Sequence, residues 1–194
     1  MFSVSTAFSS CTEVLVPMAK TQGLGKVHVI TGPGKGKTTA AFGLAMRASG
    51  QGLRTTIVQF MKCGETTGEV IAAKRLKGLD VHQFGTGRFV DPKNPSKDDR
   101  KCAHDALEFA RSVLEKGKCD LMILDEVSLA ASLGLIDPAE VLEMLKSRAN
   151  EIEIVLTGRN APIEFIEYAD YVSLIESKKH PYDRGLKARK GIEW

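Results

Sequence analysis

The chain has 194 residues, of which 43% are hydrophobic and 26% charged, the composition of an ordinary globular domain. Its 27 basic and 24 acidic residues leave a net charge of +3, which is too balanced to indicate a nucleic-acid partner. No run approaches the roughly 20 continuous apolar residues of a membrane-spanning helix, so we expect neither a nucleic-acid partner nor a membrane partner.

The four cysteines, at positions 11, 63, 102 and 119, form no CxxC pair and no pattern typical of a disulfide framework. We therefore expect a reduced, cytoplasmic protein. Each cysteine is predicted to be a small buried or half-buried hydrophobic residue.

Residues 1–24 differ from the rest of the chain, because they are rich in Ser and Thr and almost uncharged. They lack the basic region and the apolar core of a secretory signal. Two alternatives stay open for them: a flexible N-terminal extension, or an arm that folds over the active site. One domain is expected to follow, over residues 25–194.

Short runs of β-branched and apolar residues alternate with segments in which apolar residues recur at helical spacing. In chain order the predicted elements are strand Val27–Thr31, helix Lys37–Ser49, strand Thr55–Phe60, helix Gly68–Lys77, strand Leu79–Phe84, helix Lys97–Lys116, strand Leu121–Leu124, a helix capped by Asp137, strand Ile152–Thr157, a short helix from Pro162 and strand Tyr171–Ile175. This alternation predicts a single α/β domain, with a mainly parallel sheet and helices on both faces.

The sharpest motif is a glycine-rich stretch between the first strand and the first helix, where a phosphate-binding loop belongs. It reads Thr31-Gly32-Pro33-Gly34-Lys35-Gly36-Lys37-Thr38-Thr39. Glycines let backbone N–H groups turn toward phosphate oxygens, and the helix N-terminus adds its positive dipole end. Lys37 is expected to place a charge on a phosphate, and the Thr38 hydroxyl to bind Mg²⁺. Thr31 stands at the first glycine position of the usual spacing, so the loop is a variant.

Two acids, Asp125 and Glu126, end the apolar strand Leu121–Leu124. In phosphate-loop proteins an acid at the end of a neighbouring strand binds Mg²⁺, directly or through water. Such a pair alone could also be a helix cap or a surface pair. Together with the loop it predicts a Mg²⁺–nucleotide site at the carboxyl edge of the sheet. These residues leave the reaction open, since a kinase, a nucleotide switch and a nucleotidyl or adenosyl transferase all fit.

Several segments together resemble the P-loop ATP:corrinoid adenosyltransferases. In family order they are TGPGKGKTTAAFGLAMRASGQG (31–52), IVQFMK (57–62), GE (64–65), ILDEVSLAASLGLID (123–137), VLTGRNAP (155–162), YADYVSLI (168–175) and KHPYDRGLKARKGIEW (179–194). The TGR-x-AP part of the fifth segment and the C-terminal segment are the most specific. The resemblance implies a RecA-like P-loop NTPase fold for residues 25–194, with ATP bound in the reverse sense along the loop.

The resemblance also implies a reaction. The 5′-deoxyadenosyl group of ATP would be transferred to the Co(I) of a reduced corrinoid, with release of triphosphate, in adenosylcobalamin biosynthesis or salvage. Co(I) is then the nucleophile, so no side chain needs to be one. The implied substrates are ATP and a corrinoid, and the implied metal is Mg²⁺ (or Mn²⁺). A homodimer and an electron-donating reductase such as a flavoprotein are implied as partners.

The family pattern implies roles for individual residues. The catalytic candidates are Lys37, Thr38 and Glu126, and the metal candidates are Thr38, Asp125 and Glu126. The implied contacts to ATP or corrinoid are Gly32, Pro33, Gly34, Lys35, Gly36, Lys37, Thr38, Thr39, Arg47, Gln59, Phe60, Phe89 and Arg159. Some alternatives stay open: Arg47 as a solvated helix charge, Phe60 as a core residue and Arg159 as the partner of an acid. The tail residues that match a segment near the active site are His180, Tyr182, Asp183 and Lys187, with no catalytic role for the histidine.

Two positions depart from the family pattern. Pro33 replaces the usual Asn and has neither an N–H nor an amide side chain. The family's Gly-Phe-Thr-Trp segment, whose aromatics help to displace the lower axial ligand of the corrinoid, falls in Gly85-Thr86-Gly87-Arg88-Phe89-Val90, with Val90 at the Trp position. Either Phe89 takes over this role, or the protein prefers corrinoid precursors with a weaker lower ligand.

Two other functions stay open from the sequence. A P-loop small-molecule kinase or NTPase would form ADP, whereas the transferase would form triphosphate. A binder of ATP and corrinoid without turnover is the second alternative. The presence of Lys37, Thr38, Asp125 and Glu126 argues against this second alternative.

Overall fold

The computed structural model describes residues 23–64, 66–149 and 151–193. Within them, six strands form one parallel sheet in the order β3-β2-β4-β5-β1-β6. The strands are β1 (Val27–Thr31), β2 (Thr55–Phe60), β3 (Leu79–Phe84), β4 (Leu121–Asp125), β5 (Glu153–Thr157) and β6 (Tyr171–Leu174). The predicted α/β domain with a parallel sheet is confirmed. The prediction for the N-terminal extension lies almost entirely outside the described residues.

The helices are α1 (Lys37–Gly50), α2 (Gly68–Ala73), α3 (Lys97–Glu115), α4 (Val127–Ser132), α5 (Pro138–Ser147) and α6 (Ile163–Tyr168), followed by the 3₁₀ helix η1 (Pro181–Arg184). As predicted, Asp137 caps α5, and its side chain accepts a hydrogen bond from the Ala139 N–H at 2.8 Å. One predicted helix is too long, and one helix was not predicted. The helix from Gly68 ends at Ala73 instead of Lys77, and α4 has no counterpart in the sequence analysis.

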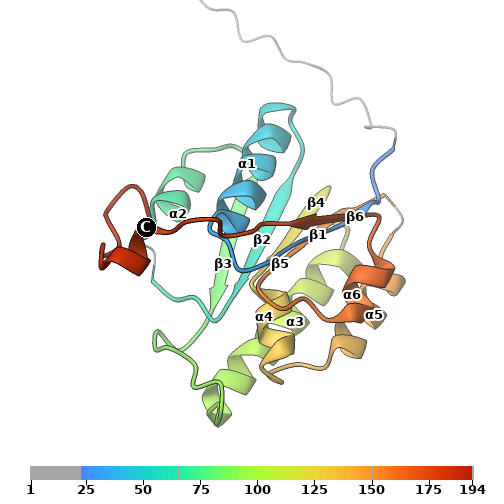
Figure 1. Cartoon of the computed structure of the whole chain (residues 1–194). Coiled ribbons are helices and arrows are strands. Elements are labelled where there is room, and N and C mark those ends of the chain that lie inside the picture. The colour runs from blue at the N-terminus through green and yellow to red at the C-terminus, as the bar shows by residue number, and fades with distance from the viewer. Residues whose placement is uncertain (1–22, 65, 150, 194) are drawn as a thin grey trace, which may run out of the picture.

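The helices cover both faces of the sheet (Figure 1). α1 and α2 lie on one face, and α3, α4, α5 and α6 lie on the other. Successive residues of β4 show this alternation, because Ile123 packs with the α1 side while Met122 and Leu124 pack with the α3 side. Within the described ranges, every helix is too short or too polar to cross a membrane.

The strand register brings the carboxyl ends of four strands to one edge. Gln59 of β2 lies beside Asp125 of β4, and Leu124 lies beside Leu156 of β5. Thr157, the last residue of β5, lies beside Ile30 of β1. The glycine-rich loop leaves β1 at the same edge, so the loop and the acidic end of β4 meet there, as predicted.

Candidate active site

The phosphate loop, residues 32–36, packs directly against the end of β6. A Cβ atom on Gly32 would lie 2.5 Å from the Ile175 carbonyl oxygen, and one on Gly34 would lie 2.7 Å from the Glu176 carbonyl oxygen. The Gly34 N–H donates to the Ile175 carbonyl at 2.8 Å. These two glycines therefore allow a close backbone approach, and the Gly34 N–H is already engaged.

The end of the loop presents the N-terminus of α1. Gly36 is the N-cap residue, with φ of 117°, and no side chain caps the helix. The N–H groups of the first helical turn have no acceptor within the helix. Together with Lys37, Thr38 and Thr39, this helix end has the chemistry to bind an anion.

Lys37 points back into the loop instead of into solvent. Its Nζ donates to the carbonyl oxygens of Gly32 and Gly34, both at 2.7 Å. Burial lowers the pKa of Lys37, and the nearby charge of Arg159 lowers it further. Arg159 itself is exposed just after β5. The loop thus holds an ammonium group on neutral acceptors, beside a second cation.

Lys35 connects the loop to the C-terminal tail. Its Nζ donates to the Ile192 carbonyl at 3.2 Å and to Glu193 Oε1 at 3.1 Å. The tail therefore reaches the site, although through residues that the sequence analysis did not single out. His180 caps η1, and its Nδ1 accepts from the Tyr182 N–H at 3.1 Å, which is a structural role.

Asp125 is the centre of a buried hydrogen-bond network. Its Oδ1 accepts from Thr38 Oγ1 at 2.9 Å and from Thr157 Oγ1 at 2.7 Å. Its Oδ2 accepts from Gln59 Nε2 at 2.9 Å and from Lys62 Nζ at 2.6 Å. Burial alone would raise the pKa of Asp125, but Lys62 and these hydrogen bonds outweigh it and hold the pKa below its usual range.

The pKa of Glu126 is shifted in the opposite direction from that of Asp125. It adopts a φ of 66°, which is uncommon outside glycine, and its N–H donates to Thr157 Oγ1 at 3.0 Å. Its Oε2 is buried without a hydrogen-bond partner. Burial raises the pKa of Glu126, and the charge of Asp125 raises it further.

The donor set around these acids fits a hard divalent cation. A hydroxyl oxygen from Thr38 and carboxylate oxygens from Asp125 and Glu126 are the ligands that Mg²⁺ takes in nucleotide sites. The unpartnered Glu126 Oε2 is a buried acceptor that such a cation would satisfy. The residues present therefore fit Mg²⁺.

Four of the remaining candidates lie in different surroundings. The Phe60 side chain is completely buried in the core, which favours the alternative of a core residue over a ligand contact. Gln59 is 2% exposed and reaches the site through Asp125. Arg47 is exposed, ten residues and about 15 Å along α1 from Lys37. Phe89 is fully exposed, whereas its neighbour Val90 packs against the core.

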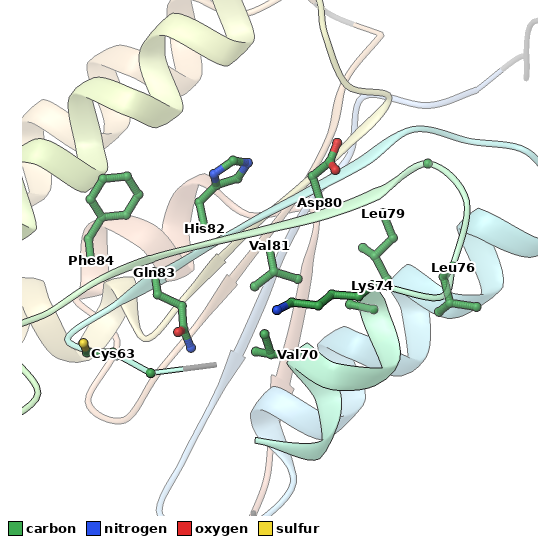
Figure 2. Close-up of a pocket in the computed structure, with 13 residues that line it drawn as sticks. Cys63, Val70, Lys74, Leu76, Leu79, Asp80, Val81, His82, Gln83 and Phe84 are labelled. Carbon is green, nitrogen blue, oxygen red and sulfur yellow. The ribbon is translucent and has the colours of Figure 1, made fainter. Parts of the chain in front are cut away.

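The sequence predicts no individual role for two residues at the site, Thr157 and Gln83. Thr157 ends an apolar strand, and a polar residue at that position was the available signal. Gln83 Nε2 donates to Gln59 Oε1 at 2.8 Å and so extends the network to the edge strand. Gln83 also lines a groove of about 650 Å³ between β3 and α2 (Figure 2), toward which Val81 points as well, while His82 and Phe84 point away.

One exposed cysteine contradicts the prediction that all four are buried or half-buried. Cys63 is exposed, Cys102 is half-buried and Cys119 is buried. Burial raises the pKa of the Cys119 thiol to about 11, so that thiol is not a nucleophile at neutral pH. Cys11 lies outside the described residues.

Comparisons with known proteins identify the family. The model of the family "ATP:corrinoid adenosyltransferase BtuR/CobO/CobP" matches residues 23–194. The chain is 37% identical over 179 residues to a corrinoid adenosyltransferase of a Sinorhizobium species, covering 90% of this chain and 83% of the relative. It is 34% identical over 170 residues to that of Escherichia coli strain K12, and 32% identical over 170 residues to corrinoid adenosyltransferase CobA of Salmonella typhimurium. Both alignments cover 88% of this chain and 86% of the relative. With its loop and acids at one sheet edge, this chain belongs to the ATP:corrinoid adenosyltransferase family.

Proposed function

We propose that the phosphate loop and the acids at the end of β4 act together to transfer the 5′-deoxyadenosyl group of ATP to the Co(I) of a reduced corrinoid. The observation that carries the proposal is the 2.9 Å hydrogen bond between Thr38 Oγ1 and Asp125 Oδ1. It joins the first turn of α1 to the acidic strand end, where a Mg²⁺–triphosphate unit would bind both.

The chemistry explains why the site is built from cations and N–H groups. Co(I) donates an electron pair to C5′ of the ribose, and the bond from C5′ to the triphosphate oxygen breaks. The electrons of that bond leave with the triphosphate, and the cobalt becomes alkylated Co(III). The protein therefore has to bind ATP, orient it and stabilise charge on the leaving triphosphate.

Lys37 is the residue best placed for this charge stabilisation. Its present acceptors are two neutral carbonyl oxygens, and the charged oxygens of a triphosphate bind an ammonium group more strongly. We expect Nζ to leave the loop carbonyls for the triphosphate, next to the N–H groups at the start of α1. Thr38, Asp125 and Glu126 would hold Mg²⁺, which supplies further positive charge to the same leaving group.

We assign the nucleoside and the corrinoid to the solvent side of this edge. A shallow hollow along α1 is lined by Ala40, Gly43, Leu44, Met46 and Arg47. We propose that Arg47 contacts the nucleoside from this hollow. Phe89 projects into solvent from the loop after β3 and is the aromatic available to a corrinoid from that loop. Since Val90 is packed against the core, we assign the displacement of the lower axial ligand to Phe89.

An anaerobic assay with MgATP and chemically reduced cob(I)alamin tests the function. We expect loss of the Co(I) absorption, a light-sensitive adenosylated product and one triphosphate for each adenosyl group transferred. Formation of ADP would instead support the kinase or NTPase alternative. Tight binding of both substrates without any product would support a binding role.

The remaining partners follow from the chemistry and from the family. Co(I) has to be generated by a reductant, for which we propose a reduced flavoprotein. We also propose a homodimer and a cytoplasmic location. Light scattering on the purified full chain measures the oligomeric state, and a coupled assay that starts from Co(II) with reduced flavodoxin measures the electron transfer.

A further inference from the structure

We propose that Lys62 is a tethered cation that occupies the metal position of the metal-free protein and leaves it when Mg²⁺ binds. The inference rests on the proposed function in one respect, which is that Thr38 and Asp125 are metal ligands. Lys62 Nζ lies 2.6 Å from Asp125 Oδ2 and 3.2 Å from Thr38 Oγ1. It therefore contacts two of the three residues assigned to the metal.

The carboxylate of Asp125 has no capacity left for a metal while Lys62 is in place. A carboxylate offers about four lone-pair positions, and Asp125 accepts four hydrogen bonds, two on each oxygen. A cation that binds Asp125 directly has to replace one of the four donors. The identity of that donor decides how the site opens.

Lys62 is the donor that can leave at least cost. Gln59 is 2% exposed and is also held by Gln83, and Thr157 is fully buried and also accepts from the Glu126 N–H. The Lys62 side chain is 31% exposed and belongs to the segment after β2. Its long flexible stem allows the ammonium to move into solvent or onto a phosphate.

Charge balance makes the departure conditional on another cation. Asp125 is completely buried, and among the described residues Lys62 is the cation that hydrogen-bonds to it. Withdrawing Lys62 alone would leave a buried carboxylate without a hydrogen-bonded counter-charge, which is strongly unfavourable. The arrival of a divalent cation removes that penalty, so the two cations exchange.

The backbone at Met61, just before Lys62, forms a tight turn at the end of β2. Met61 has a φ of 57°, and its N–H donates to the Phe84 carbonyl at 2.8 Å. A Cβ atom on Gly85 would lie 2.6 Å from the Met61 carbonyl carbon, so Gly85 allows the end of β2 to approach. A non-glycine residue in the left-handed region is uncommon and is retained mainly at functional positions. The turn directs Lys62 toward Asp125.

The exchange would couple the metal to the nucleotide. Without ATP, the metal competes for Asp125 with the Lys62 ammonium group, which is covalently tethered beside the site. With ATP, the triphosphate offers the displaced ammonium a new set of charged acceptors. Metal binding alone is then weak, and metal binding together with ATP is strong, because each favours the same displaced state of Lys62.

The test is Mn²⁺ binding to the full-length protein without nucleotide, measured by the electron paramagnetic resonance signal of free Mn²⁺. We expect Lys62→Met to bind Mn²⁺ roughly tenfold or more tightly than the unmodified protein, because the competing charge is gone. Lys62→Arg should bind Mn²⁺ no better than the unmodified protein. Lys118→Met is the matched control, since Lys118 is exposed and distant in the fold.

Two further readouts separate this role from a merely structural one. Lys62→Met should lower the melting temperature of the metal-free protein, and Mn²⁺ should raise it more in the variant than in the unmodified protein. In the unmodified protein, amine acylation of Lys62 followed by mass spectrometry should increase when Mn²⁺ is added, while acylation of Lys118 stays constant. The second readout needs no variant to fold.

Unchanged, weakened or undetectable Mn²⁺ binding in Lys62→Met would overturn the inference, as would acylation of Lys62 that does not rise with Mn²⁺. These results are independent of corrinoid. A protein that transfers the adenosyl group normally but shows no such change keeps the proposed function and loses the inference. A protein without transfer whose Lys62→Met variant binds Mn²⁺ more tightly keeps the inference and loses the function.

Discussion

The phosphate loop and the acidic end of β4 face each other across the site, and each holds one lysine in a different way. Lys37 donates to two neutral carbonyl oxygens at 2.7 Å, whereas Lys62 donates to a buried carboxylate oxygen at 2.6 Å. Removing Lys37 from its acceptors leaves no buried charge behind, but removing Lys62 does. The loop is therefore arranged to receive an anion, and the end of β4 to receive a cation.

Replacing Lys37 should remove the charge with which the phosphate loop stabilises the triphosphate. We expect Lys37→Ala to lower kcat on the order of 10²–10³-fold, because the charge that faces the leaving triphosphate is lost. The loss of Co(I) absorption under saturating MgATP measures this, and the melting temperature reports the fold. Lys118→Ala, which removes an exposed lysine, should leave the rate unchanged. Normal turnover of Lys37→Ala would refute the assigned site.

Replacing Gln59 should weaken metal binding at the end of β4, because Gln59 orients Asp125. Gln59→Leu removes one of the four donors to the carboxylate and leaves its orientation less fixed, so we expect a loss of about 10–100-fold in kcat at low Mg²⁺. Gln83→Leu is the graded control, because Gln83 reaches Asp125 through Gln59 and should have the smaller effect. Equal effects of the two substitutions would contradict the chain Gln83–Gln59–Asp125. A titration of rate against Mg²⁺ concentration measures both.

Replacing Phe89 tests the contribution of the loop after β3 to corrinoid activation. We expect Phe89→Ala to slow the reaction about three- to tenfold when complete cobalamin is presented as Co(II) with a reductant, since one aromatic contact is lost. Cobinamide has a weaker lower ligand, so the rate with cobinamide should fall less in Phe89→Ala. Measuring both corrinoids with the same protein preparation provides the control. Full activity of Phe89→Ala with complete cobalamin would assign the displacement of the lower ligand to another residue.

The pH dependence of stability distinguishes Glu126 from Asp125. Because the pKa of Glu126 is raised in the folded protein, the folded state binds more protons than the unfolded chain between the ordinary and the raised pKa. The metal-free protein therefore loses stability as the pH rises through that window. Glu126→Gln lacks this loss, and we expect its melting temperature to be about 2–4 °C higher above the window and equal below it. Scanning calorimetry without metal measures the difference, and an advantage that is independent of pH would contradict it.

The parts of the site that lie in one stretch of chain were predictable from the sequence. Lys37, Thr38 and Asp125 each come after a recognisable strand. Their residue types indicate a phosphate contact for the lysine and metal contacts for the other two. The edge at which they meet follows from the alternation of strands and helices. Glu126 was predicted as a metal ligand, although its left-handed backbone was not, because the helix that begins after it is short and has no capping signal.

The parts that depend on pairing between strands were not predictable. Thr157 and Gln83 contact Asp125 and Gln59. A polar strand end marks Thr157, but which residues face each other depends on the register of neighbouring strands, which a single segment does not encode. The sequence leaves Phe60 open between a ligand contact and the core. All six residues of β2 are buried, so alternation along the strand gives no inward or outward signal.

The packing of the phosphate loop on the end of β6 has a consequence for protein synthesis. Gly32 and Gly34 are synthesised long before Ile175 and Glu176, against which they pack. β6 is also an edge strand, attached to the sheet through β1 alone. A nascent chain that ends before Tyr171 lacks the support for its phosphate loop. The phosphate loop therefore gains this backbone support only after the segment of β6 has been synthesised.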